Sequence, residues 1–509
     1  MMMTHPGLPA IWGMIVIGSM VIMTLWAVIA PLPGSAGATA YSLTRVPLLR
    51  SLVQHLVSSP KILPSLKIIF VALFLLVIYA GLFGNPIPER NIATVLTWNI
   101  WWAGLIFSVF FLGTAWCAVC PWDTLAQWLV RRRLWKRAEP NNSLNLRVPR
   151  ALRTIWPALL MFIALTWLEL GLGITTDPYA TAIVSLLMVV LATSSLAIFE
   201  RKAFCRYFCP VGRTVGFYSQ LAPVELRPIN TQTCADCKSL DCYYGDKHTE
   251  PCPTWLVMGR LKQNSYCTSC GNCVRSCTHN NIAWRLRAPS IEAVQDARPR
   301  HDEAWFMIGL LALTGFHGLS MMSFWEAWMS DLARMLNDSG QLLVSFTVGM
   351  FGSMAAVVLV YALFVLFTRQ LVGGTSFRRL FMTLAFVALP LAFAYHMAHN
   401  LNHLVREGVG VGAVFENPLG TGMAPLSTLE KHARHLDMLI SQETLFAIQA
   451  GLMVFGFWIA VQIVRHRGHA LLTAAGHVGR WRLAPMLGFV MLMTGFHLWL
   501  LSQPMTMRM

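Results

Sequence analysis

The chain has 509 residues, of which 56% are hydrophobic and only 12% are charged, and its mean hydropathy is +0.55. This composition excludes an ordinary soluble globular protein and indicates an integral membrane protein. The formal net charge of +16 fits contact with lipid headgroups on one side of a bilayer, and nucleic-acid binding is a poor alternative.

Apolar runs long enough to cross roughly 30 Å of hydrocarbon recur along the chain. Ten such runs lie at residues 10–31, 68–84, 94–115, 155–173, 180–199, 304–325, 343–367, 380–399, 443–464 and 484–502. The first run lacks a basic n-region and is long enough to span, so we expect a membrane helix there and no cleaved signal peptide. The sequence therefore predicts an all-α integral membrane protein with ten transmembrane helices.

Lysine and arginine are concentrated in alternate connecting segments. Of the 39 basic residues, 33 lie in segments 32–67, 116–154, 200–303, 368–379 and 465–483. Because cytoplasmic flanks keep positive charge during insertion, we expect these segments on the cytoplasmic side of a bacterial inner membrane, with both termini periplasmic. All 12 cysteines would then lie on or near the cytoplasmic face, where a reducing compartment favours metal clusters over structural disulfides.

Two cysteine pairs stand at the predicted inner ends of the third and fifth helices, and each pair is followed by proline. They are Cys117 with Cys120 and Cys205 with Cys209. A Cys-Pro turn just below the bilayer could bind a third cluster, or could act as a redox dithiol that relays electrons toward the lipid. The simpler alternative is that each proline ends its helix and the cysteines are small buried apolar residues. The matched pairs favour redox chemistry without deciding which kind.

Four cysteines between residues 267 and 277 have the spacing of a [4Fe-4S] ferredoxin loop. A zinc site is the alternative, but zinc motifs pair their ligands across a longer gap. In two-cluster ferredoxins the fourth cysteine of each run binds the other cluster. This rule assigns Cys234, Cys237, Cys242 and Cys277 to one [4Fe-4S] cluster and Cys252, Cys267, Cys270 and Cys273 to a second. We therefore expect residues 200–303 to form a cytoplasmic ferredoxin-like domain between membrane domains at 1–199 and 304–509.

Paired Cys-Pro turns followed by a two-cluster ferredoxin resemble the NosR, NapH and CcoG group of membrane polyferredoxins. The run from Phe204 to Gly212, FCRYFCPVG, is especially similar to the second NosR-type motif. The likeness covers roughly residues 68–290, and the first pair has two intervening residues where the group has three. The resemblance implies a protein that carries electrons between the quinone pool or cytoplasmic donors and periplasmic enzymes or copper sites. We expect no counterpart of the NosR flavin domain, and the second membrane half lies outside the resemblance.

Histidines lie within predicted helices of the second membrane half. The motif Thr-Gly-Phe-His occurs twice, ending at His317 and His497, and both histidines fall at one predicted depth; His396 and His399 lie on a helix between them in the chain. Imidazoles at matched depth could be axial ligands of haem b, or could bind copper together with methionines near the outer rim. The alternative is that each histidine hydrogen-bonds a neighbouring helix, although ionisable groups inside a membrane are usually functional.

Together these patterns predict a membrane-bound iron-sulfur electron-transfer protein of a respiratory chain. It would pass electrons between a cytoplasmic or quinone-pool donor and a periplasmic redox partner, and Glu169 in the fourth predicted helix could handle quinol protons. The main alternative is a redox-dependent maturation factor that supplies electrons, or reduced copper or iron, to a periplasmic metalloenzyme. A metal transporter with a redox sensor is a weaker alternative. No dinucleotide or phosphate-binding motif stands out, so NAD and ATP are not expected as ligands.

Overall fold

The computed structural model describes residues 4–31, 40–42, 61–131, 142–477 and 479–506. For His432 and residues 434–436 it describes the backbone alone. Parts of two segments that the charge pattern assigns to the inner side, 32–67 and 116–154, therefore lie outside the described residues.

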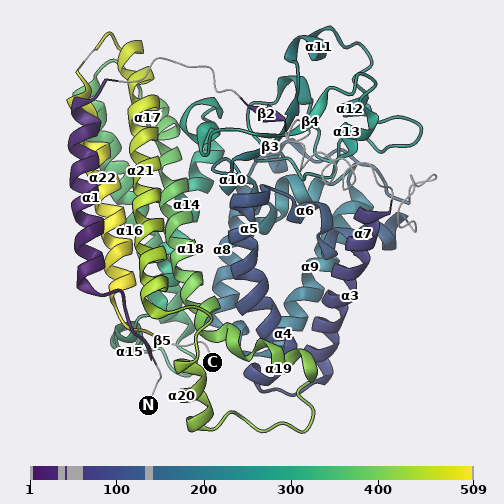
Figure 1. The fold of residues 1–509 in the computed structure, drawn as a ribbon, viewed down its shortest axis with the longest axis vertical. Helices are drawn as coiled ribbons and strands as arrows, with labels where there is room; N and C mark the ends of the chain where they lie inside the picture. Colours follow the sequence, from purple (N-terminus) through teal and green to yellow (C-terminus); the bar gives the residue numbers. More distant parts are fainter. Residues whose placement is uncertain (1–3, 32–39, 43–60, 132–141, 478, 507–509) are drawn as a thin grey trace.

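Helices make up most of the described chain (Figure 1). Those before the cysteine-rich region are α1 (Ala10–Ile29), α3 (Ile62–Phe83), α4 (Ile92–Thr94), α5 (Trp102–Leu112), α6 (Trp116–Val119), α7 (Pro121–Arg131), α8 (Trp156–Gly171), α9 (Pro178–Ile198) and α10 (Pro210–Tyr218). Those after it are α14 (His301–Ser320), α15 (Ser323–Leu336), α16 (Leu343–Val372), α17 (Phe377–Leu384), α18 (Ala388–Glu407), α19 (Val411–Glu416), α20 (Thr428–Leu436), α21 (Gln442–Ala474) and α22 (Ala484–Ser502). A π-helical turn, Val95–Trp101, joins α4 to α5 in one continuous rod.

The predicted membrane helices all coincide with helices of the structure, but their number stays a prediction. Within the described residues, 8 helices are long and apolar enough to cross a membrane. The other two predicted spans correspond to α8 and α14. Helix α8 has 16 residues, slightly fewer than the roughly 17 residues that a spanning helix needs. Helix α14 ends at Ser320 and a separate helix begins at Ser323, so the predicted span 304–325 extends past the true end of the helix.

Helix α18 lies at the centre of the second membrane half. It packs against α14 and α21, and it also contacts α5 and α10 of the first half. Nearly all of its side chains are buried, including three histidines, His396, His399 and His403. A helix surrounded by other helices can keep such polar side chains away from lipid.

The first helix belongs in space to the second half of the chain. Helix α1 packs against α21 and α22, and strand β1 (Thr4–His5) pairs antiparallel with β5 (Met505–Thr506). The backbone N–H of Leu8 also donates to the carbonyl of Leu501 at 2.7 Å. Both chain ends therefore meet at one end of the bundle, which we call the terminal end (Figure 1).

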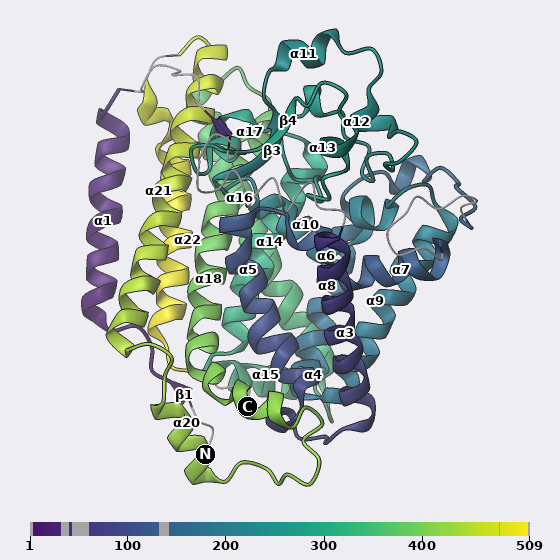
Figure 2. The same cartoon turned by 45° about the vertical axis from the view of Figure 1, so that its right-hand side comes forward.

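The cysteine-rich region occupies the opposite end of the bundle, which we call the cysteine end (Figures 1 and 2). Its sheet has the strand order β2–β4–β3, all antiparallel. These strands are β2 (Tyr41–Ser42), β3 (Val224–Pro228) and β4 (Ile282–Leu286), and the short helices beside them are α11 (Thr231–Asp236), α12 (Asp241–Tyr244) and α13 (Asn272–Ser276). The small core under the sheet contains Cys252, Cys267 and Cys273 next to Leu226 and Met258. Cysteines thus replace much of the apolar core that a region of this size would otherwise need.

Candidate iron-sulfur sites

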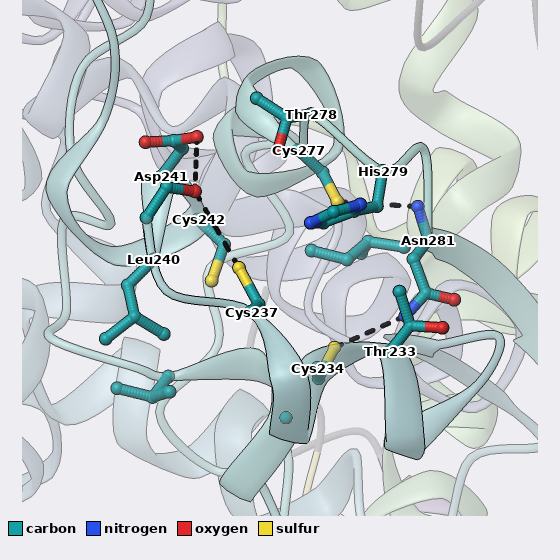
Figure 3. Close-up of a pocket in the computed structure, with 14 residues that line it drawn as sticks. Thr233, Cys234, Cys237, Leu240, Asp241, Cys242, Cys277, Thr278, His279 and Asn281 are labelled. Atoms are coloured by element: carbon teal, nitrogen blue, oxygen red, sulfur yellow. Dashed lines mark hydrogen bonds between the residues drawn. The ribbon is translucent and has the colours of Figure 1, made fainter.

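The first cysteine set, Cys234, Cys237, Cys242 and Cys277, lines a single pocket. Figure 3 shows the four sulfurs converging on it from α11, α12 and the end of α13. The amide of Asn281 donates to the sulfur of Cys234 at 3.3 Å, and its backbone N–H donates to that of Cys277 at 3.4 Å. Backbone N–H donation from Leu240 lowers the pKa of the Cys237 thiol. Such donors favour thiolate sulfur, the form that binds iron.

The second cysteine set, Cys252, Cys267, Cys270 and Cys273, lies in the core of the same region. Three of these side chains are buried and Cys270 is partly exposed. Burial is the main cause that raises the pKa of the Cys267 thiol to about 12, and the neighbouring Cys270 and Cys252 contribute to this rise. The loop turns at Gly271, whose φ of 75° lies in the left-handed region. The loop and Cys252 thus bring four sulfur donors into one small region, as a metal cluster requires.

The third cysteine set, Cys117, Cys120, Cys205 and Cys209, brings together the two Cys-Pro pairs. Electrostatic interactions connect Cys120 with both Cys117 and Cys209, and Cys205 with both Cys120 and Cys209. In each pair the proline after the second cysteine begins a helix, α7 or α10, as expected because proline fits the first helical position. The backbone N–H of Gly212 donates to the sulfur of Cys209 at 3.2 Å. A helix N-terminus favours negative charge and therefore a thiolate.

Basic side chains surround the third cysteine set. Lys202 contacts Asp123 at 2.5 Å, and the sulfur of Cys205 lies 3.8 Å from the same carboxylate. Arg213 is buried and lowers the pKa of the Cys117 thiol. Even so, burial is the dominant cause and raises the pKa of Cys117 to about 12. Positive charge at this position would offset the negative charge of four metal-bound thiolates.

The second and third sets are packed directly on each other. The hydroxyls of Thr114 and Ser269 lie 2.6 Å apart, and Arg213 donates to the carbonyl of Ser265 at 2.7 Å. A Cβ added to Gly216 of α10 would lie 2.0 Å from the same carbonyl oxygen, so only glycine allows this approach. The first and second sets share one small core. The three sets therefore form a continuous series from the cysteine end to the helix bundle.

A mostly apolar cavity adjoins the third set. We call it the tryptophan cavity because it is lined by Trp98, Trp101, Trp102 and Trp122. Glu169 also lines it, as do Pro210 and Val211, which directly follow Cys209 in the chain. The empty space in and at the mouth of this cavity is about 740 Å³, and part of it is open to the surroundings. A smaller pocket shares Trp102 and Glu169 with it and is also lined by His317, His396 and His399. No local pattern predicts this cavity, because three of its tryptophans lie on one continuous helical rod while Trp122 and Glu169 come from two other helices.

The structure brings together three of the four histidines that the sequence singled out. The rings of His317 and His399 are 5.3 Å apart, and His396 contacts the hydroxyl of Tyr218 at 3.2 Å. His497 is absent from the lining of this pocket and stacks on Tyr395 at 4.3 Å. The repeated motif therefore puts His317 and His497 in different surroundings, and haem and copper both stay predictions.

The sequence reasoning missed one buried group at the terminal end. His5 and His403 both approach the carboxylate of Glu407, at 3.6 and 2.8 Å. His5 carried no signal in the sequence because its partners are close only in the folded chain.

Comparison with known proteins addresses the third cysteine set. Residues 94–138 and 179–222 match the model of a family described as a 4Fe-4S binding domain, and these segments contain both Cys-Pro pairs. These matches support an iron-sulfur electron-transfer protein. These matches do not assign the chain to the NosR, NapH and CcoG group, so that resemblance stays a prediction. The number of clusters also stays a prediction.

Two curated relatives match smaller parts of the chain. The Escherichia coli K12 protein YccM, whose name describes it as a candidate electron transport protein, is 34% identical over 20% of this chain. An uncharacterized protein of Methanocaldococcus jannaschii is 28% identical over 22% of it. The matched segments span 27% and 42% of those relatives. No solved structure matches.

Proposed function

We propose that this chain passes electrons across or within a membrane through three [4Fe-4S] clusters, one held by each cysteine set. The observation that carries the proposal is the position of the third set, packed against the second set on one side and against the tryptophan cavity on the other. Each set offers four sulfurs, the ligand number that a [4Fe-4S] cluster takes. A cluster supplies one-electron transfer when it is bound.

The pKa of the third-set thiols favours a cluster over a redox dithiol. A dithiol that exchanges with partners needs an accessible thiol with a lowered pKa. Burial instead raises the pKa of Cys117 to about 12 and also raises the pKa values of Cys120 and Cys205. Such thiols lose their protons readily only when a metal cation binds.

The tryptophan cavity supports exchange with the quinone pool. A quinone ring needs an apolar space at membrane depth, close to an electron carrier and to groups that move protons. Oxidation of one quinol would release two electrons, one at a time to the third set, and two protons to Glu169 and the adjoining histidines. In this proposal the cysteine end faces the cytoplasm, and the first set exchanges electrons with a soluble partner there.

Aromatic rings also lead from the third set toward the terminal end. The ring centroid of Trp101 lies 5.6 Å from that of Trp116 and 5.9 Å from that of Trp102. The centroids of Trp102 and His396 are 5.7 Å apart. This series supports an acceptor on the periplasmic side, as the sequence predicted.

A redox-dependent maturation factor is a second candidate. Methionines gather at the terminal end, where Met322 pairs with Met505 and the carbonyl of Met321 accepts from Thr506. Met505 also pairs in register with His5, and a thioether donor together with an imidazole would suit reduced copper.

Quinol-driven reduction tests the leading proposal. The full chain, purified without oxygen and placed in lipid nanodiscs, is mixed with a short-chain quinol while bleaching of the iron-sulfur absorbance is followed. We expect Leu165→Trp, which fills the tryptophan cavity, to slow this reduction at least tenfold, because the quinone ring loses its space. Reduction by dithionite and the iron content should stay unchanged.

The matched control is Leu160→Trp on the same helix, because Leu160 is 63% exposed toward the lipid side. It should behave like the unaltered chain. Equal rates for Leu165→Trp and the unaltered chain would contradict the quinone part of the proposal, and absence of iron would contradict all of it.

A further inference from the structure

We propose that His5, His403 and Glu407 form a binding site for one divalent transition-metal ion at the terminal end of the bundle. The site lies away from the cysteine sets, and the inference depends on neither candidate function.

Three ligand atoms converge at this place. One atom from each residue lies within 4.8 Å of the other two, and all three residues are buried. A tetrahedral ion with bonds of about 2.0–2.2 Å separates its ligand atoms by roughly 3.4 Å. The observed contacts to the carboxylate, at 2.8 Å from His403 and 3.6 Å from His5, fall on either side of that value.

The residue types identify the class of metal. Two imidazoles and one carboxylate are the protein ligands of many zinc sites and of non-haem iron(II) sites, which leave further positions for water or another ligand. Neither a hard ion such as calcium, which prefers oxygen, nor a cluster, which needs thiolates, suits this set. The ligands fit zinc, iron(II), cobalt(II) or copper(II).

Charge balance also favours a cation. Glu407 is buried, and a buried carboxylate is costly unless positive charge compensates it. Its neighbour Arg406 is directed to Asn402, to which it donates at 2.8 Å. A divalent ion would neutralise Glu407 and give both imidazoles a role as neutral ligands. The competing arrangement is a protonated histidine paired with the carboxylate, and it needs no metal.

The site exists only when the two ends of the chain meet. His403 and Glu407 lie one turn apart on the same face of α18, whereas His5 arrives on β1, which pairs with β5. A Cβ added to Gly7 would lie 2.1 Å from the carbonyl oxygen of Ser502, so the segment after His5 is held tightly against the end of α22. Such a backbone fixes the His5 imidazole in advance of binding, which lowers the entropy cost of the site.

A row of rings connects this site to the pocket beside the tryptophan cavity. Successive ring centroids are 5.3 Å apart from His317 to His399, 5.1 Å from His399 to His403 and 5.8 Å from His403 to His5. The proposed ion therefore stands at the far end of the histidine row.

Cobalt(II) is the probe for this proposal. The full chain, purified without oxygen and with its iron-sulfur content measured, is treated with a chelator that removes loosely bound metal and is then titrated with cobalt(II). We expect one cobalt per chain, with visible bands of nitrogen and oxygen ligation and no thiolate charge-transfer band. His403→Gln and Glu407→Gln should each weaken binding at least about 100-fold, more than the loss of an outer-shell partner costs.

Two further variants keep the test decisive. His5→Gln alters a two-residue strand and should weaken binding without disturbing the helices, even if a substitution in α18 impairs folding. The matched control, His466→Gln, alters a histidine of the same half that lies beside Gln295, and it should bind cobalt like the unaltered chain. Absence of a cobalt site of nitrogen and oxygen ligation, or equal binding by His5→Gln and His466→Gln, would overturn the proposal in favour of a histidine–carboxylate ion pair.

Discussion

Cys209 combines the two influences that act on the cysteine sulfurs. Its sulfur accepts from the N–H of Gly212 at a helix N-terminus, which favours a thiolate, while burial raises the pKa of the thiol. Burial dominates in the third set, so these sulfurs need iron to become thiolates. The same balance holds for Cys267, whose pKa burial raises to about 12. Individual sulfurs therefore fit metal ligands better than mobile redox thiols.

Replacing Cys209 tests this conclusion. We expect Cys209→Ser to lower the iron content by about four atoms per chain, because one [4Fe-4S] cluster loses a ligand. Iron analysis with electron paramagnetic resonance of the reduced protein gives the measurement. Ala118→Ser, in the same turn as Cys117 and Cys120, is the control and should keep all its iron. A dithiol would instead leave the iron unchanged in Cys209→Ser.

Single histidines illustrate the limit of motif reading. His317 and His497 end identical four-residue motifs, yet one lines a pocket with His399 and the other stacks on Tyr395. A motif fixes the position of a residue on its own helix. The packing of neighbouring helices decides which residues that face of the helix contacts.

At the scale of elements, α10 connects the membrane bundle to the cysteine-rich region. Cys209 caps the N-terminus of α10, and near the other end of the helix Gly216 allows close contact with the backbone of Ser265. Helix α10 is buried along its whole length. A helix enclosed in this way holds the second and third sets in a fixed relation.

Gly216→Ala tests that role. The new Cβ would lie 2.0 Å from the Ser265 carbonyl oxygen, so we expect a loss of roughly 1–3 kcal/mol of stability from overpacking. Thermal unfolding followed by loss of iron-sulfur absorbance provides the measurement.

Gly104→Ala is the control for that experiment, because a Cβ there meets nothing within 4 Å. Alanine in a helix is favoured over glycine by up to about 1 kcal/mol, so Gly104→Ala should be neutral or stabilising. Equal stability of the two variants would mean that the Ser265 segment moves aside easily.

At the scale of the whole molecule, the helix bundle has a large apolar core, whereas the cysteine-rich region does not. The cysteine-rich region has a small core in which three cysteines take part, so we expect iron to hold it together. Anaerobic removal of iron by a chelator should let protease cleave between residues 229 and 290. Circular dichroism should show that the helical halves remain folded, and an unchanged protease pattern would contradict this expectation.

Membrane orientation is a second property of the whole molecule. The termini lie at one end of the bundle and the cysteine-rich region at the other (Figures 1 and 2). In spheroplasts, external protease should remove tags from both termini, but should not reach a tag inserted between Asp246 and Glu250. Accessibility of all three tags, or of only one terminus, would contradict the predicted topology.

Much of the helical fold could be predicted from the sequence, because a membrane-length helix is encoded by a continuous run of apolar residues. Apolar length predicted the long helices, and the family match over both Cys-Pro pairs supports an iron-sulfur protein. The assignment of the other eight cysteines to clusters stays a prediction. Helix ends were less certain: α14 stops at Ser320, because a second helix begins directly after it.

The sequence by itself determined that this is an apolar helical chain with cysteines grouped for iron, since both features depend on residue type and short spacing. Tertiary structure alone decided that α1 packs with the second half, that Glu169 lines the tryptophan cavity beside Cys209, and that His5 meets Glu407. These contacts join residues far apart in the chain. They form because buried surfaces must fit one another in three dimensions, and no local pattern records that fit.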